Sequence, residues 1–243
     1  MIELERSRDA GALLRDSFSV YRRHFWTFLA IGAIVVVPSE LIVSGVGLEQ
    51  LSSGYDASPN FAEAAVPGAV SFLVVAPLIN AICVFALRSV AAGNSPRARD
   101  SLVRGFELFT PLFLAVVLAA LGIAVGLLLI LPGIYLFVRW YFVPQVVVLE
   151  DARGTDSLRA SGRIIEGSWW RTFGLIVLVN AVALLAALVI GAPFTAAADS
   201  ANLAIWSLTG QMLAGAIAQP FGALYSTLLY FDLRARRSSR PSP

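Results

Sequence analysis

The most constraining feature of this sequence is an apolar stretch of 39 residues, 111–149, that contains a single charged residue, Arg139. As one straight α-helix it would be about 58 Å long, roughly twice the thickness of a bilayer's hydrocarbon core. The stretch must therefore fold back on itself. Pro132 and Gly133, near its middle, are the natural place for a turn, because proline and glycine interrupt helices. We predict a transmembrane hairpin with a charged residue in its second arm.

Composition extends this interpretation to the whole chain. Charged residues make up 14% of the sequence and hydrophobic residues 58%, whereas a soluble domain carries about 25% charged residues. We therefore predict an all-α, polytopic membrane bundle: one integral membrane domain over residues 1–237, followed by a disordered tail at 238–243. The net charge is only +2, and the arginines lie between apolar segments. That distribution argues against nucleic-acid binding.

The apolar segments predict six transmembrane helices. Their approximate bounds are 25–46, 65–87, 111–131, 133–149, 170–190 and 205–230. Apart from Arg139, every arginine lies before the first of them, at 88–110, at 150–171 or in the C-terminal tail, and the loops at 47–64 and 193–203 contain none. Because short cytoplasmic loops are enriched in basic residues, we expect a multi-pass protein of a bacterial plasma membrane with both termini cytoplasmic.

A segment with helical periodicity precedes each pair of predicted spans. Apolar residues recur at i, i+4, i+7 and i+11 from Leu14, from Leu102 and, with Gly162 as a weak member, from Leu158. This spacing is typical of an amphipathic helix lying on the membrane surface. We expect the arginines around these helices to face lipid headgroups, namely Arg15, Arg22, Arg23, Arg104, Arg159, Arg163 and Arg171.

These patterns predict a threefold repeat over 9–92, 97–149 and 154–233. Each unit holds a surface helix, a first span expected to end near Pro38, Pro132 or Pro193, and a second span with an interior proline. The interior prolines are expected to kink their helices, and each has an amide side chain close by; the pairs are Pro77 with Asn80, Pro144 with Gln145, and Pro220 with Gln219. An amide can donate to the backbone carbonyls that a proline leaves unpaired. Alternatively, the three amides line a polar cavity within the membrane.

Two charges fall inside predicted spans. Arg139 lies seven residues after Pro132, and Glu40 lies in the far third of the first span, at a similar predicted depth. A lone arginine at the centre of a membrane helix costs at least about 2.5 kcal/mol. We therefore predict an ion pair between Glu40 and Arg139. The alternative is that Arg139 reaches the interface or a lipid headgroup while Glu40 reaches outer water.

Several segments resemble the glycerophosphoryl diester phosphodiesterase membrane-domain family and related uncharacterised six-span bacterial membrane proteins. They are LLRDSFSVYRRHFWTFLAI, PGIYLFVRW, EGSWWRTFG and ALYSTLLYFDLRARR. The resemblance runs from about Leu13 to Arg237. In some members of that family a soluble phosphodiesterase barrel follows the membrane portion. We expect no such barrel here, so the resemblance is taken to imply no catalytic activity.

The residues themselves favour a non-enzymatic protein with no cofactor, metal site or catalytic residue. The chain has one histidine, His24, and one cysteine, Cys83, whereas metal-dependent phosphodiester hydrolysis needs several clustered ligands. Asp232 is expected to form a surface pair with Arg234. We therefore expect a membrane module that binds lipid or a separate cytoplasmic or membrane protein at the inner leaflet. The alternative is a small transporter or lipid-handling protein with a polar site near Arg139, which requires a continuous cavity joining Arg139 to Asn80, Gln145 and Gln219.

Overall fold

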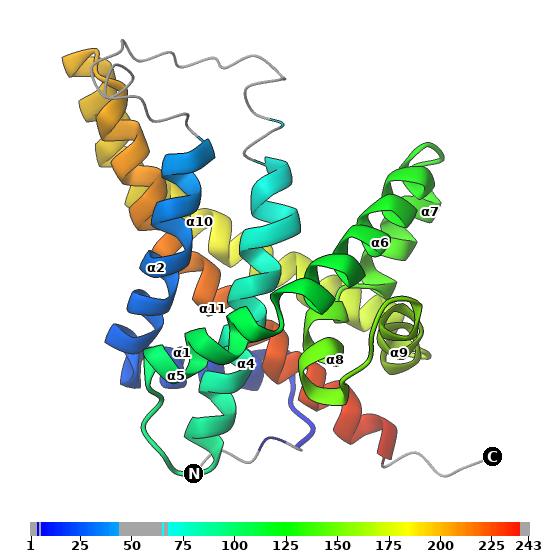
Figure 1. Cartoon of the computed structure of the whole chain (residues 1–243). Coiled ribbons are helices and arrows are strands. Elements are labelled where there is room, and N and C mark those ends of the chain that lie inside the picture. The colour runs from blue at the N-terminus through cyan, green and yellow to red at the C-terminus, as the bar shows by residue number, and fades with distance from the viewer. Residues whose placement is uncertain (1–3, 5, 44–64, 66–67, 239–243) are drawn as a thin grey trace.

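The computed structural model describes residues 4, 6–43, 65 and 68–238, and these ranges fold into helices and connecting turns without a β-strand (Figure 1). The predicted loop at 47–64 and residues 239–243 of the predicted tail lie outside the described residues. Ser238, the first residue of that predicted tail, instead ends the last helix.

Within the described ranges, six helical segments are long and apolar enough to cross a membrane, as in a multi-pass membrane protein. They are α2 (Phe25–Val43), the π-helix η2 (Ser71–Val75) continued by α4 (Ala76–Ala91), α6 (Phe109–Leu127), α7 (Leu131–Arg139) followed by α8 (Val143–Glu150), α10 (Trp169–Ala201) and α11 (Ala204–Ser238). The prediction of an all-helical protein with six apolar spans is confirmed at this level.

Three shorter helices precede α2, α6 and α10. They are α1 (Ala10–Arg23), α5 (Ala98–Glu107) and α9 (Thr155–Ile165), and all three lie at the lower end of the bundle in Figure 1. The Asp9 carboxylate caps α1 by accepting a 2.6 Å hydrogen bond from the Ala12 amide, which satisfies one of the free N–H groups of the first turn.

The buried faces of α1 and α5 match the predicted apolar faces only in part. In α1, Leu13, Ser17 and Val20 are buried, whereas Phe18, which was expected on the apolar face, is 59% exposed. In α5, Leu102 is buried but Phe106 is half exposed. Tyr21, which was also expected on the apolar face of α1, is buried, so the buried and predicted faces overlap in part.

Helix α11 is the centre of the bundle. It packs against α10, α2 and α4 along its length and also contacts α1 and α9. Its C-terminal half contains a run of fully buried residues, Leu224, Tyr225, Leu228, Leu229 and Tyr230. Gly32 of α2 lies against the backbone of Ala216, and this close approach leaves no room for a side chain at position 32. Small residues at such crossings let membrane helices pack tightly.

Two of the three first arms continue past the predicted prolines, and the third ends shortly before its proline. Helix α2 continues through Pro38 to Val43, and α10 continues through Pro193 to Ala201, where Asn202 adopts a left-handed conformation (φ 51°) before α11. The 111–149 hairpin reverses direction at residues 128–130, and Pro132 lies just after this reversal, in the first helical turn of α7. Proline is tolerated in a first helical turn because its missing N–H has no partner there.

One of the interior prolines occupies a different position from that expected. Pro144 stands at the start of α8, whereas Pro77 lies where η2 continues into α4 and Pro220 lies within α11. The predicted fourth span is divided at residues 140–142 into α7 and α8. Its two parts therefore pack independently, α7 against α6 and α8 mainly against α4, α6 and α9.

Candidate functional site

A cluster of three polar side chains lies inside the bundle. Asn80 Oδ1 of α4 accepts hydrogen bonds from Gln145 Nε2 of α8 (2.9 Å) and from Ser226 Oγ of α11 (2.7 Å), and Gln145 Nε2 also lies 2.9 Å from Ser226 Oγ. Gln145 is fully buried, and its Oε1 accepts no hydrogen bond from a described residue. The second helical arm of each predicted unit thus contributes one member to the cluster.

Two of the three predicted amides therefore meet, but the third does not. Gln219 lies near Gly215, which packs against Val36 of α2, and its Oε1 is buried without a partner among the described residues. Ser226, about two turns further along α11, takes the place expected for Gln219. A serine in an apolar run gives a weak sequence signal, since serine is common in membrane helices as a packing residue.

The amide of Asn80 does not replace the hydrogen bond that Pro77 lacks. Asn80 Nδ2 donates to the carbonyl of Ala76 at 2.8 Å, one turn back on its own helix. The carbonyl that Pro77 leaves free belongs to Leu73, four residues before it. The π-helix η2 lies at this point and accommodates the proline by altered backbone hydrogen bonding.

A cavity of about 240 Å³ borders this cluster. Its walls come from η2, α4, α6, α7, α8 and α10, and from the break between α7 and α8; the lining residues are Phe72, Ala76, Pro77, Asn80, Val116, Ala119, Ile123, Phe137, Trp140, Tyr141, Val143, Pro144 and Asn180. Neither Arg139 nor Gln219 lines it. This cavity therefore does not join Arg139 to Gln219, as the transport alternative requires.

Arg139 lies against the short helix α9 instead of Glu40. Its guanidinium group donates a 3.1 Å hydrogen bond to the Tyr135 hydroxyl and lies 5.9 Å from the centre of that ring. A Cβ atom at Gly162 of α9 would lie 2.9 Å from Arg139 Nε. No ion pair joins Arg139 to Glu40 in the described ranges, so this predicted contact is wrong. The break after α7 turns Arg139 toward the arginine-rich end of the bundle.

The strongest charge cluster surrounds Asp232, near the end of α11. Its carboxylate is completely buried and accepts hydrogen bonds from Arg171 at 2.7 Å, Arg236 at 2.9 Å and the backbone N–H of Arg8 at 2.6 Å. Both arginine side chains also donate to the Arg8 carbonyl, at 2.8 and 2.7 Å. The prediction of an exposed Asp232 is wrong, because folding brings the N-terminal segment and the start of α10 over it.

An open pocket of about 680 Å³ lies beside this cluster. It is lined by Ser7, Gly167, Ser168, Trp169, Trp170, Arg171 and Arg236. Trp170 is 79% exposed, and Trp169 stacks on Phe173 with ring centres 5.4 Å apart. Arg171 and Arg236 both pair with Asp232, so guanidinium and indole groups stand side by side in the pocket wall. An anionic group with an apolar portion suits this combination of guanidinium and indole groups.

The other arginines expected at headgroups mostly keep exposed side chains. Arg15, Arg22, Arg23, Arg104, Arg159 and Arg163 are all exposed. Arg159 pairs with Asp156 at 3.2 Å on its own helix, and Arg104 lies 5.9 Å from the ring of Phe85. Arg171 differs from them, because its role is to neutralise the buried Asp232.

The short helices share a motif that the sequence interpretation missed. An aspartate, a serine and a large apolar residue follow one another at 16–18 in α1, at 100–102 in α5 and at 156–158 in α9. The serines Ser17, Ser101 and Ser157 are all buried. The repeated Asp-Ser pair was visible in the sequence, but hydrophobic periodicity gave it no weight because serine is polar.

His24 and Cys83 have local structural surroundings. His24 lies at the corner between α1 and α2, where partial burial and the neighbouring Arg23 lower the pKa of its imidazole. Cys83 is completely buried in α4. Within the described ranges, no three His, Cys, Asp or Glu side chains gather closely enough to hold a metal ion.

Comparison with known proteins gives one family match. Neither the curated proteins nor the solved structures include a match to this chain. A family model described as a domain of unknown function, DUF7847, matches residues 69–233. This range includes the whole of α4 to α10 and most of the central helix, α11. The match covers more than half of the chain, which therefore belongs to the DUF7847 family.

Proposed function

We propose that this protein is a non-enzymatic integral membrane module that binds anionic lipid headgroups at the inner leaflet. The observation that carries the proposal is the pocket in which Trp169 and Trp170 lie beside Arg171 and Arg236. Indole rings favour the membrane interface, and each arginine near an anionic surface contributes about 1 kcal/mol of attraction. The exposed arginines of α1, α5 and α9 extend this positive surface along the same end of the bundle.

The orientation in the membrane follows from the same charges. We infer a bacterial plasma-membrane location, with the arginine-bearing end of the bundle and both termini on the cytoplasmic side. The proposed arrangement is three hairpins, each preceded by an amphipathic surface helix. It is supported by the Asp-Ser pairs of α1, α5 and α9 and by the contribution of one residue from each second arm to the Asn80 cluster. Kinship with the glycerophosphoryl diester phosphodiesterase membrane-domain family is a further proposal, carried by the PGIYLFVRW and EGSWWRTFG segments.

Native mass spectrometry of the purified, delipidated chain tests the proposed function. The probes are dioleoylphosphatidylglycerol and dioleoylphosphatidylcholine, which differ in headgroup charge but not in acyl chains. We expect the anionic lipid to be retained preferentially and its retention to fall as ionic strength rises. Equal retention of the two lipids at low ionic strength would overturn the proposal.

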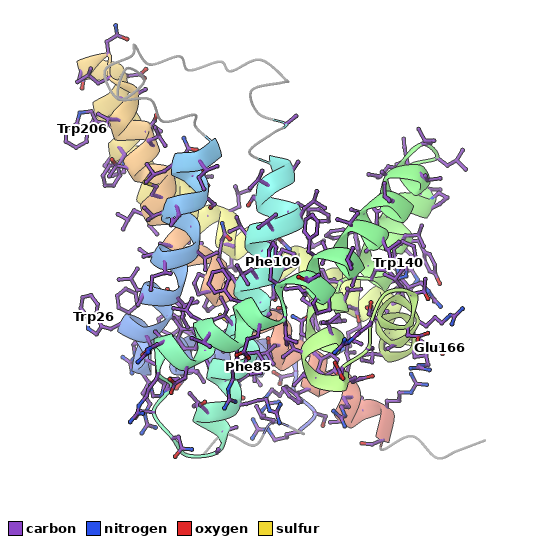
Figure 2. All side chains as sticks on the ribbon, viewed as in Figure 1. Trp26, Phe85, Phe109, Trp140, Glu166 and Trp206 are labelled. Carbon is purple, nitrogen blue, oxygen red and sulfur yellow. The ribbon has the colours of Figure 1, made fainter. Side chains whose placement is uncertain are left out.

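Two tryptophan variants locate the lipid. Trp170→Ala removes a 79% exposed side chain from the pocket, and Trp26→Ala removes a 78% exposed side chain from the start of α2, outside the pocket. Figure 2 shows Trp26 pointing away from the bundle. We expect Trp170→Ala to weaken retention of the anionic lipid by about fivefold, the equivalent of 1 kcal/mol, and Trp26→Ala to leave it unchanged. Equal losses in both variants would contradict the assignment of the pocket.

A further inference from the structure

The cavity beside the Asn80 cluster differs in chemistry from the interfacial pocket, and the two share no lining residue. All of its lining residues belong to the candidate membrane spans, and none is charged. A charged ligand group would lose its hydration there without gaining a counter-ion, at a cost of several kcal/mol. The occupant must therefore be neutral and soluble in the membrane.

The polar groups on the cavity wall have unused hydrogen-bonding capacity. Asn180 Nδ2 donates to the Ile176 carbonyl at 2.8 Å, but its Oδ1 accepts no hydrogen bond from a described residue. The Tyr141 hydroxyl and the Trp140 indole N–H likewise form no hydrogen bond within the described ranges. The wall thus offers one free acceptor, Asn180 Oδ1, together with the free donors of Tyr141 and Trp140.

Two features keep this space open. Trp140 packs over Gly122 of α6, where a Cβ atom would collide with the indole ring, and Figure 2 shows Trp140 beside the α6–α7 hairpin. Ala119 presents only a methyl group to the cavity. The volume of about 240 Å³ lies just below the range of small-molecule pockets. It accommodates the polar end of a lipid whose chains continue into the bilayer.

We propose that this cavity binds the hydroxyl end of a neutral lipid alcohol. A hydroxyl group both donates and accepts hydrogen bonds, so its chemistry matches both the free acceptor, Asn180 Oδ1, and the free donors of the wall. An ester or ketone only accepts and would leave Asn180 Oδ1 unpaired. This site is separate from the proposed headgroup pocket, so either can fail without the other.

The test uses the purified full chain and two matched glycerolipids. Native mass spectrometry compares 1,2-dioleoylglycerol, which has a free hydroxyl, with 1,2-dioleoyl-3-acetylglycerol, in which that hydroxyl is capped. Loss of one hydrogen bond corresponds to about fivefold weaker binding, which is the preference expected for the free alcohol. Oleyl alcohol is a third probe that distinguishes a single-chain alcohol from a diacylglycerol as the source of the hydroxyl. Equal binding of all three probes would overturn the proposal.

Variants connect that preference to the cavity. Asn180→Leu removes the free acceptor at an exposed position of α10, so it is expected to abolish the fivefold preference while the capped lipid binds as before. Tyr141→Phe removes a donor that the free alcohol and the capped ester can both use, so it should weaken both lipids and leave the preference in place. Thr195→Leu is the matched control, because Thr195 is an exposed polar residue of α10 outside the cavity. It should leave the preference intact. Persistence of the preference in Asn180→Leu, or its loss in Thr195→Leu, would overturn the proposal.

Discussion

Asn80 and Gln145 form a hydrogen bond 2.9 Å long across the interface between α4 and α8, although 64 residues separate them in the chain. Ser226 joins them from α11, so the bond connects three parts of the bundle. In a membrane these side chains have no water to replace a lost partner. The cluster thus fixes the positions of α4 and α8 against the central helix, at the edge of the uncharged cavity.

A double-mutant cycle at this contact should show coupling. We expect Asn80→Ala and Gln145→Ala each to lower the free energy of unfolding. The double variant should lose about 1 kcal/mol less than the sum of the two single losses, as for other hydrogen bonds between membrane helices. Unfolding by sodium dodecyl sulfate in mixed micelles gives the free energies. Asn180→Ala is the control, because Asn180 makes the same bond to its own helix but none to another helix; its effect should stay within about 0.5 kcal/mol. Strictly additive losses at positions 80 and 145 would contradict the coupling.

Asp232 should be among the residues most sensitive to loss of charge. Asp232→Asn removes the buried carboxylate that Arg171 and Arg236 share, and breaking a buried pair costs about 3–5 kcal/mol. Because the two arginines are about one-third exposed, we expect about 3 kcal/mol, measured by the same unfolding method. The exposed pair of Asp156 with Arg159 is the matched case, and Asp156→Asn should cost below about 1 kcal/mol. Similar losses for both variants would mean that the buried carboxylate has no special role.

The sequence predicted the parts of this fold that depend on bulk hydrophobicity. Six apolar segments were located because each needs about 20 residues to cross a membrane. The turns were misplaced because proline was read as a helix end, whereas α2 and α10 continue through Pro38 and Pro193. Membrane helices tolerate proline when neighbouring groups satisfy the backbone, and a single sequence does not reveal those neighbours.

The candidate site was predicted only where each residue carried a strong signal of its own. Asn80 and Gln145 stood out as amides within apolar runs, and they do meet. Ser226 and the burial of Asp232 depend on which helices become neighbours, and hydropathy carries no such information. Arg139 was assigned a depth on the assumption of one straight helix, but the break at 140–142 invalidates that measurement. Contacts between helices therefore account for most of the errors.

The pH dependence of stability should have a component from His24. Burial and Arg23 lower the pKa of its imidazole in the folded protein, whereas the unfolded chain binds the proton with a pKa of about 6.5. The unfolded state therefore takes up more protons below that pH, so this contribution is fully present above about pH 6.5 and is lost as the pH falls toward the folded value. The thermal midpoint in detergent, followed from about pH 7.5 to 5.5, should fall less in His24→Gln. The chain has no other histidine, so an unchanged pH profile in His24→Gln would contradict this origin.

Substitution by alanine should change the free energy of unfolding in opposite directions at Gly32, where α2 crosses α11, and at Gly222 of α11. At Gly32, a Cβ atom would collide with the backbone of Ala216, which cannot move aside as a flexible side chain could. Gly32→Ala should therefore destabilise the protein by about 1–3 kcal/mol, the usual cost of overpacking. At Gly222 of α11 a Cβ atom would meet no other atom within 4 Å, so Gly222→Ala should stabilise it by up to about 1 kcal/mol through helix propensity. Unfolding free energies in mixed micelles compare the two variants directly. A neutral or stabilising Gly32→Ala would show that α2 and α11 do not pack as closely as this crossing requires.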